Sequence, residues 1–180
     1  MAKLTRDYHE SIQQDVPACT PEEREHTTIE ALDNIHTPLP ARLHTNLQLQ
    51  ITETDVADAL ALCQSGRAAG INGLIYELWK ALQSRFLNHT SNHKPAFNII
   101  QTLTWIYNDI ELNGVSPSTE FATGWLCPLY KKKDKREISN YRPITLLNSD
   151  YKIFTKALSL KLAKSAPSVI HTNQAGFIPG

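Results

Sequence analysis

The 180-residue sequence lacks net charge, long apolar runs and a cysteine framework. Cys19, Cys63 and Cys127 are too far apart for a zinc site and odd in number, which indicates ordinary thiols in an intracellular protein. No stretch of about 18 apolar residues is present, so no membrane span is expected. The polar start of the chain argues against a signal peptide. There is also no P-loop, no dinucleotide-binding pattern and no Asp-Asp pair.

The neutral total hides an uneven distribution of charge. Residues 1–80 hold six Lys and Arg against twelve Asp and Glu, a net charge of −6. Residues 124–180 hold ten against three, a net charge of +7. A basic third in a neutral chain indicates a local anion-binding surface, for which phosphates are the usual ligand.

Hydrophobic spacing predicts helices after residue 45 and little regular structure before it. Residues 1–45 are polar and weakly periodic, so we assign them as an N-terminal extension, with one short helix starting at Thr20-Pro21. An extended linker is expected over residues 36–40. The remainder, 46–180, is expected to be one partial domain. Its predicted helices span 53–65, 74–86, 96–112 and 151–164. Thr52 is expected to cap the first and Asp150 the last. A polar break is expected over 87–95, between the second and the third.

Two β-like stretches, 124–131 and 141–147, flank a charged loop and predict a hairpin with a long tip. Each stretch contains a proline, which favours edge strands that project into solvent. The hairpin gathers six cations. Lys131 and Arg142 fall where the strands meet the loop, and a triphosphate needs such a pair, since Lys supplies a mobile charge and Arg a planar fork. The other cations, expected to contact nucleic acid, are Lys132, Lys133, Lys135 and Arg136.

Other interpretations of these features remain open. The lysines could form a solvated charge cluster, and Lys131–Arg136 could be a nuclear-localisation patch, so a nuclear location is left open. The glycine-rich loop 66–73 could bring backbone amides to a phosphate or could be a simple turn between helices. Trp125 could stack on bases or lie in the core.

The order and spacing of these motifs resemble LINE-type (non-long-terminal-repeat) retrotransposon reverse transcriptases over roughly residues 37–180. The residues that carry the resemblance are Tyr130-Lys131, the run from Asn140 to Asn148, Asp150-Tyr151-Lys152-Ile153, and Gln174 with Gly176-Phe177. The resemblance implies an α+β fold, the fingers and the start of the palm of a right-hand polymerase. It implies RNA-directed DNA synthesis with an RNA template, a DNA primer and a deoxynucleoside triphosphate, and no membrane partner.

By the same resemblance, nucleotide contacts fall on Lys131, Arg142, Gln174 and Phe177, and template contacts on Arg67, Gly70, Asn72 and Gly73. The sequence departs from the family at 69–73, where Ala69 and Asn72 replace the usual proline and aspartate. The family's catalytic, magnesium-binding aspartates lie beyond the Gln-x-Gly-Phe motif. We therefore assign no catalytic residue and no cofactor to this chain, and expect it to be inactive alone, with Mg²⁺ serving the complete polymerase. A basic nucleic-acid-binding module and a degenerate retroelement product remain alternatives.

Overall fold

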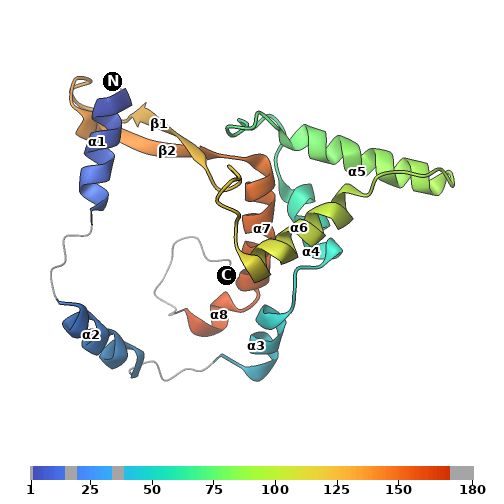
Figure 1. Cartoon of the computed structure of the whole chain (residues 1–180), viewed down its shortest axis with the longest axis horizontal. Helices are drawn as coiled ribbons and strands as arrows, with labels where there is room; N and C mark the ends of the chain where they lie inside the picture. Colours follow the sequence, from blue (N-terminus) through green and yellow to red (C-terminus); the bar gives the residue numbers. More distant parts are fainter. Residues whose placement is uncertain (1, 15–19, 34–38, 171–180) are drawn as a thin grey trace. The chain divides into compact units, whose positions relative to one another are not determined.

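The computed structural model, drawn in Figure 1, describes residues 2–14, 20–33 and 39–170. The chain divides into two compact units. The first, which we call the hairpin unit, comprises Met1–Pro38 and Leu126–Ile144; the second, the helical unit, comprises Leu39–Trp125 and Thr145–Gly180. The mixture of helices with a two-stranded antiparallel sheet is compatible with the expected α+β class. The predicted domain boundary at residue 45 stays a prediction.

The helical unit holds α3 (Ala41–Gln48), α4 (Glu53–Leu62), α5 (Tyr76–Ser91), α6 (Ile99–Asn113), α7 (Ser149–Ala163) and α8 (Ala166–Val169). Helix α4 packs against α7 and α6, and α5 packs against α6. Their apolar faces meet in one core, which includes Val56, Ala59, Trp79, Ile100, Leu103, Tyr107, Ile153 and Phe154.

Helix α4 begins as the sequence predicts. Thr52 Oγ1 accepts a hydrogen bond from Asp55 N (3.2 Å), and Asp55 Oδ2 accepts one from Thr52 N (2.9 Å), so the capping box is confirmed. Partial burial raises the pKa of Asp55, but the Thr52 hydrogen bonds and nearby Lys164 and Lys161 outweigh it, and the pKa lies below its ordinary value. The helix ends at Leu62, before the predicted 65, because Cys63 is extended.

Helix α5 corrects the predicted polar break at 87–95, because the helix continues to Ser91. The polar residues from Asn88 onward keep the helical conformation, since only a stripe of a helix has to be apolar. The helix stops where Asn92 leaves the helical region and its amide reaches back to Asn88 O (2.7 Å). His93 then takes a left-handed conformation, with φ of +55°.

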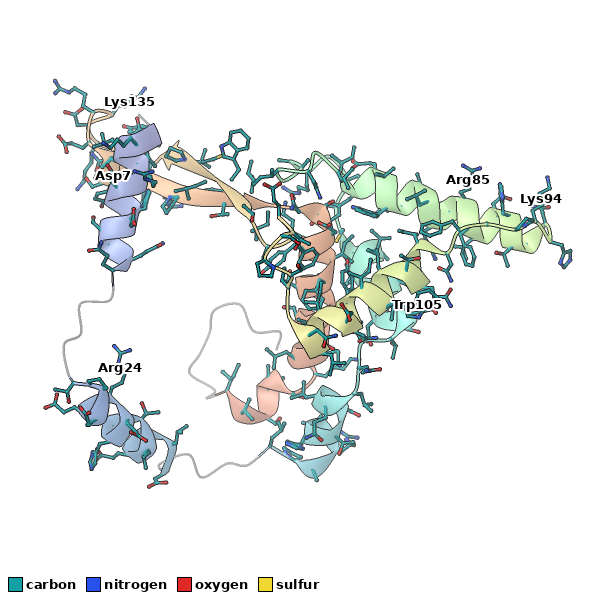
Figure 2. All side chains as sticks on the ribbon, in the orientation of Figure 1. Asp7, Arg24, Arg85, Lys94, Trp105 and Lys135 are labelled. Carbon is teal, nitrogen blue, oxygen red and sulfur yellow. The ribbon has the colours of Figure 1, made fainter. Side chains whose placement is uncertain are left out.

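Helix α6 is bounded by Asn98, whose side chain accepts from Gln101 N, and by Gly114, with φ of +78°. The predicted stop at Gly114 is confirmed. Of the apolar residues spaced three or four apart along the predicted 96–112 helix, Ile100, Leu103 and Tyr107 are buried, whereas Phe97 and Ile106 are exposed. Trp105, labelled in Figure 2, is also exposed.

The cap predicted for the last long helix was wrong. Helix α7 starts at Ser149, so Asn148 holds the N-cap position and Asp150 lies inside the first turn. The Asn148 side chain does not cap the helix, since it bonds to other loops instead. Nonlocal packing therefore decides where this helix begins.

The hairpin unit contains α1 (Ala2–Gln13), α2 (Pro21–Asp33) and most of strands β1 (Gly124–Tyr130) and β2 (Tyr141–Leu147), with a short 3₁₀ helix, η1 (Ile138–Asn140), at the tip. Helix α2 starts as predicted, with a capping box between Thr20 and Glu23. The linker expected at 36–40 lies largely outside the described residues.

The expectation of little regular structure before residue 45 was wrong, because α1 lies there and α3 begins there, at Ala41. Helix α1 has no counterpart in the sequence prediction. It packs against η1 and buries Thr5 and His9, each about 5% exposed, while Leu4 and Ile12 stay exposed. The buried face of α1 is thus polar, and the apolar residues that recur at helical spacing, Leu4, Tyr8 and Ile12, are not on it.

Candidate nucleic-acid interface

The register of the hairpin strands can be followed from the tip. Strands β1 and β2 pair over their whole length, and at the tip end Lys131 N donates to Asn140 O (2.9 Å). The rings of Tyr130 and Tyr141 lie edge to face, with centroids 5.6 Å apart, as expected for directly opposed residues. Both strands are edges of the sheet, and most of their side chains are exposed, as the prolines predicted.

This register places Lys131 and Arg142 on the same face of the hairpin. Arg142 lies opposite Leu129, and Lys131 follows Leu129 by two residues, so all three side chains leave the ribbon on one side. Both cations are exposed. Within the described chain, neither side chain has a hydrogen bond or an ion pair. The pair that the sequence predicted at the strand ends is therefore brought together with both charges open to a ligand.

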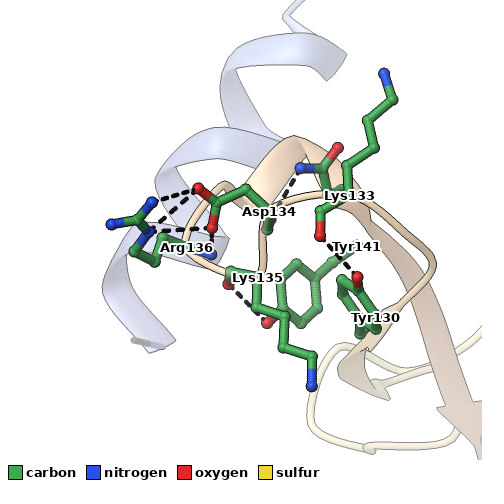
Figure 3. Close-up of polar contacts among 7 residues, drawn as sticks. Tyr130, Lys133, Asp134, Lys135, Arg136 and Tyr141 are labelled. Carbon is green, nitrogen blue, oxygen red and sulfur yellow. Dashed lines mark hydrogen bonds and ion pairs between the residues drawn. The ribbon is translucent and has the colours of Figure 1, made fainter.

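The tip is folded around Asp134 (Figure 3). Its carboxylate binds the Arg136 guanidinium, with Arg136 Nη2 2.7 Å from Asp134 Oδ2, and accepts from Arg136 N at 2.9 Å. The hydrogen bond from Arg136 lowers the pKa of Asp134. Asn140 Nδ2 donates to Asp134 O (2.9 Å) and closes the loop onto the start of β2.

Two tyrosine hydroxyls form hydrogen bonds to backbone carbonyls of the lysine-rich loop. Tyr130 Oη donates to Lys133 O (2.7 Å) and Tyr141 Oη donates to Lys135 O (2.9 Å), as Figure 3 shows. Lys133 adopts a φ of +75°, and Lys135 Nζ lies 5.3 Å from the centre of the Tyr130 ring. These contacts give a long polar loop one defined shape.

The six predicted cations are thus not equivalent. Arg136 is paired with Asp134, and Lys135 lies over an aromatic ring, whereas Lys132 and Lys133 are exposed at the tip. The charge free to meet an anion is concentrated on Lys131, Lys132, Lys133 and Arg142. The sequence could not reveal this division, because the Asp134–Arg136 pair depends on the conformation of the turn.

The glycine loop 66–73 belongs to the helical unit, so it forms a second group of predicted residues. Gly66 and Gly73 have φ of +74° and +71°, the left-handed region that glycine adopts at least cost. Gly66 N donates to the Glu77 carboxylate at the start of α5, which lowers the Glu77 pKa. Arg67 is exposed and reaches Gln64.

Gly70 allows a close backbone approach, but the group that approaches is Asn148. A Cβ atom at position 70 would overlap the backbone of Asn148. The Asn148 side chain is buried, accepts from Asn72 N (3.1 Å) and donates to Glu120 O (2.9 Å). The predicted template contacts of Arg67, Gly70, Asn72 and Gly73 stay predictions.

Ser149 continues this connection and was missed by the sequence analysis. Its hydroxyl accepts from Trp79 Nε1 (2.7 Å) in a buried hydrogen bond and donates to Leu74 O (2.8 Å), just before α5, in a partly buried one. Asn148 and Ser149 therefore fasten the glycine loop and α5 to the start of α7. The motif run Asn140–Asn148 ends in the first of these two residues, so its last residue has a structural role.

The remaining predicted residues can be placed as follows. Gln174 and Phe177 lie outside the described residues. Trp125 is 64% exposed, so the alternative that Trp125 lies in the core is wrong. Asn72 also lines an open pocket of about 610 Å³ at the C-terminal end of α6, which none of the predicted cations lines. Among the described residues, no helix is both long and apolar enough to cross a membrane.

Comparison with known proteins relates the chain to a transposon. No protein-family model matches it. It is 34% identical over 134 residues to a Xenopus laevis protein described as "Transposon TX1 uncharacterized 149 kDa protein". The alignment covers 74% of this chain and 9% of that protein. The chain is therefore homologous to a small part of a transposon-encoded protein.

Proposed function

We propose that this chain is part of the RNA-directed DNA polymerase of a LINE-type retrotransposon, and that its hairpin contacts the triphosphate of the incoming nucleotide. The observation that carries the proposal is the placement of Lys131 and Arg142 on one open face of the hairpin. The transposon homologue and the motif order support the retroelement origin. The RNA template, the DNA primer and an intracellular setting belong to the same proposal.

The face suits a triphosphate for electrostatic reasons. A lysine ammonium follows the phosphate oxygens as a mobile point charge, while an arginine guanidinium binds two oxygens in a fixed geometry. Opposed strands hold the two groups at a constant spacing, which a flexible loop would not. Because the tip is fixed by Asp134 and the two tyrosines, little order has to be gained when the anion binds.

The described residues do not fit the magnesium site of the complete polymerase. In the part of the chain that the structure describes, no three His, Cys, Asp or Glu side chains are grouped to hold a metal ion. Asp134, the acid nearest the cations in sequence, is already paired with Arg136. We therefore derive no step through a metal and assign the hairpin a binding role.

Binding to single-stranded RNA tests the open charges. Affinity should fall linearly on a log–log plot against salt, because each neutralised phosphate releases counterions. Changing Lys131, Lys132 and Lys133 to Ala should reduce the slope by about two to three units. The matched control changes three exposed cations of the helical unit, Arg85, Lys94 and Lys156, to Ala; Figure 2 shows the first two on and just after α5. Equal slopes for wild type and the hairpin variant would overturn the proposal.

A non-enzymatic strand-binding module is the second candidate. It is favoured by the exposed Lys132 and Lys133, which extend the open charge beyond the Lys131–Arg142 pair. Arg142→Lys separates the two functions, because it keeps the charge and loses the planar fork. Weaker binding of a deoxynucleoside triphosphate with unchanged RNA binding supports nucleotide contact. If Arg142→Lys leaves the affinity for the nucleotide and for RNA unchanged, the strand-binding module is supported. If the wild type binds neither ligand, a degenerate product is supported.

A further inference from the structure

Helix α2 carries a stripe of acids and apolar side chains that is exposed to solvent. None of its residues is buried. Glu22, Glu25, Ile29 and Leu32 recur every three or four residues and so lie along one stripe, which Asp33 extends. Ile29 is 53% exposed and Leu32 is 58% exposed. With five acids and one arginine, the helix has a net charge of −4.

The open hairpin face has the complementary pattern. Leu129 and Ile144 are 55% and 40% exposed and lie on the same side of the ribbon as Lys131 and Arg142. Residues 131–142 hold six cations and two acids, a net charge of +4. Helix α1 does not use this side, since it shares a shallow pocket with Leu126, whose side chain leaves the opposite face.

We propose that α2 folds onto this hairpin face and competes there with nucleic acid. The acids of the stripe would meet Lys131 and Arg142, and Ile29 and Leu32 would cover Leu129 and Ile144. The helix would thus present carboxylates where a nucleic acid presents phosphates. The regulatory part of this inference rests on the proposed nucleic-acid binding, whereas the contact between α2 and the hairpin does not.

The chain connection makes such a contact favourable. Helix α1 packs against η1 at the hairpin tip, and residues 14–20 join α1 to α2. Seven residues reach at most about 25 Å. A ligand held by so short a tether acts at an effective concentration in the millimolar range, so weak surface ion pairs are sufficient. Since the pairs are exposed, salt should release α2.

The contact itself is tested first. The full chain, at a dilution where it is monomeric, is treated with a carbodiimide that joins carboxylates to amines in direct contact. Mass spectrometry should find α2 carboxylates joined to Lys131, Lys132 or Lys133, and the yield should fall in high salt. Absence of these links would overturn the proposal. Links without RNA binding by any variant would disprove the proposed function and leave the contact standing.

The competition is tested with a charge-matched pair of variants. Glu22→Gln, Glu25→Gln and Asp33→Asn together should raise RNA affinity about five- to tenfold at low salt, the effect of losing three surface ion pairs. Asp58→Asn, Asp109→Asn and Glu111→Gln make the same change of net charge on exposed sites elsewhere. An equal rise in both variants would reveal a general charge effect and overturn the proposal.

A second variant tests the apolar part of the contact, keeping the charges of α2 and its tendency to form a helix. Ile29→Ala with Leu32→Ala removes the apolar contact, and alanine has the highest helix propensity. RNA affinity should again rise, by a smaller factor than in the acid variant. Circular dichroism verifies that α2 remains helical, and an unchanged affinity with an intact helix would exclude the predicted apolar contact.

Discussion

At the scale of single residues, Gly70 shows how strongly one missing side chain can be required. The backbone of Asn148 occupies the space where a Cβ atom of residue 70 would lie. Because the obstacle is backbone rather than a flexible side chain, it cannot move away cheaply. Gly73 differs, since its left-handed φ of +71° makes a conformational demand while no atom lies near its missing Cβ.

The two glycines should therefore respond differently to substitution. We expect Gly70→Ala to lower the free energy of unfolding by about 1–3 kcal/mol, the usual cost of an overpacked site. Gly73→Asn should cost less than about 1 kcal/mol, since asparagine tolerates the left-handed region. Urea denaturation of both variants measures the difference. A Gly70→Ala protein as stable as Gly73→Asn would contradict the packing described for Asn148.

Tyr76 should make the helical unit sensitive to alkali. Burial, and to a smaller extent Cys63, raises the pKa of Tyr76 to about 12. Burial also raises the pKa of Tyr107. A raised pKa means that the unfolded chain loses the proton first, so the stabilisation is complete below pH 10 and is lost as the pH rises toward 12.

Replacing Tyr76 with phenylalanine should flatten this dependence. The free energy of unfolding of wild type should fall between pH 10 and pH 12, and that of Tyr76→Phe should fall less steeply, with the remaining slope partly due to Tyr107. Comparison at pH 8, where the phenols are neutral, gives the cost of losing the hydroxyl itself. Identical slopes above pH 10 in the two proteins would refute the assignment.

At the scale of elements, the shape of the hairpin tip is set by side chains that form hydrogen bonds to the backbone. Tyr130 and Tyr141 each donate to the carbonyl of a lysine in the loop, and Asp134 anchors Arg136. Exposed hydrogen bonds contribute little singly, but several in one short loop restrict the same few dihedral angles. The positions of Lys132 and Lys133 should depend on this network.

Removing both tyrosine hydroxyls should loosen the tip without altering its charge. In a protein with Tyr130→Phe and Tyr141→Phe, we expect the amides of Glu137 and Asn140 to exchange roughly tenfold faster with solvent. Tyr151→Phe is the control, because Tyr151 makes a ring contact with Phe121 in the helical unit. Unchanged exchange in the double variant would mean that the strands alone define the loop.

The elements that the sequence predicted well are those with local signals. Thr52 with Asp55 and Thr20 with Glu23 start helices within four residues of chain, and the prolines of β1 and β2 mark edge strands. The failures depend on distant partners. The start of α7 is set by the bonds of Asn148 to two other loops, and α1 packs against η1 with Thr5 and His9 buried. The bonds of Asn148 leave no local signal in the sequence, and the apolar residues of α1 that do recur at helical spacing, Leu4, Tyr8 and Ile12, are not the ones it buries.

In the candidate site, too, the features with local signals could be predicted and those that depend on tertiary geometry could not. The hairpin and its cations could be predicted, because charge and β-spacing are both local. The pairing of Arg136 with Asp134 and the open state of Lys131 could not, since they depend on turn geometry.

At the scale of the whole molecule, burial is concentrated in one of the two units. The core of the helical unit joins α4, α5, α6 and α7, whereas α2 buries none of its residues. Ile153 is fully buried in that core and belongs to α7, the helix that packs most closely with α4. The helical unit should therefore unfold as one cooperative element, at a higher free energy than α2.

Hydrogen exchange with a single core substitution tests this division. Amides of α2 should exchange rapidly in the wild type, and those of α4, α6 and α7 slowly. Ile153→Ala should lower the free energy of opening in α4, α6 and α7 by about 2–5 kcal/mol, because it leaves a cavity in the core they share. It should leave the amides of α1 and of the hairpin tip unchanged. Leu112→Ala, on a position of α6 that is 79% exposed, is the control. An equal loss of protection in the hairpin unit would show that the two units unfold together in one cooperative transition. The two units would then not be independent in stability.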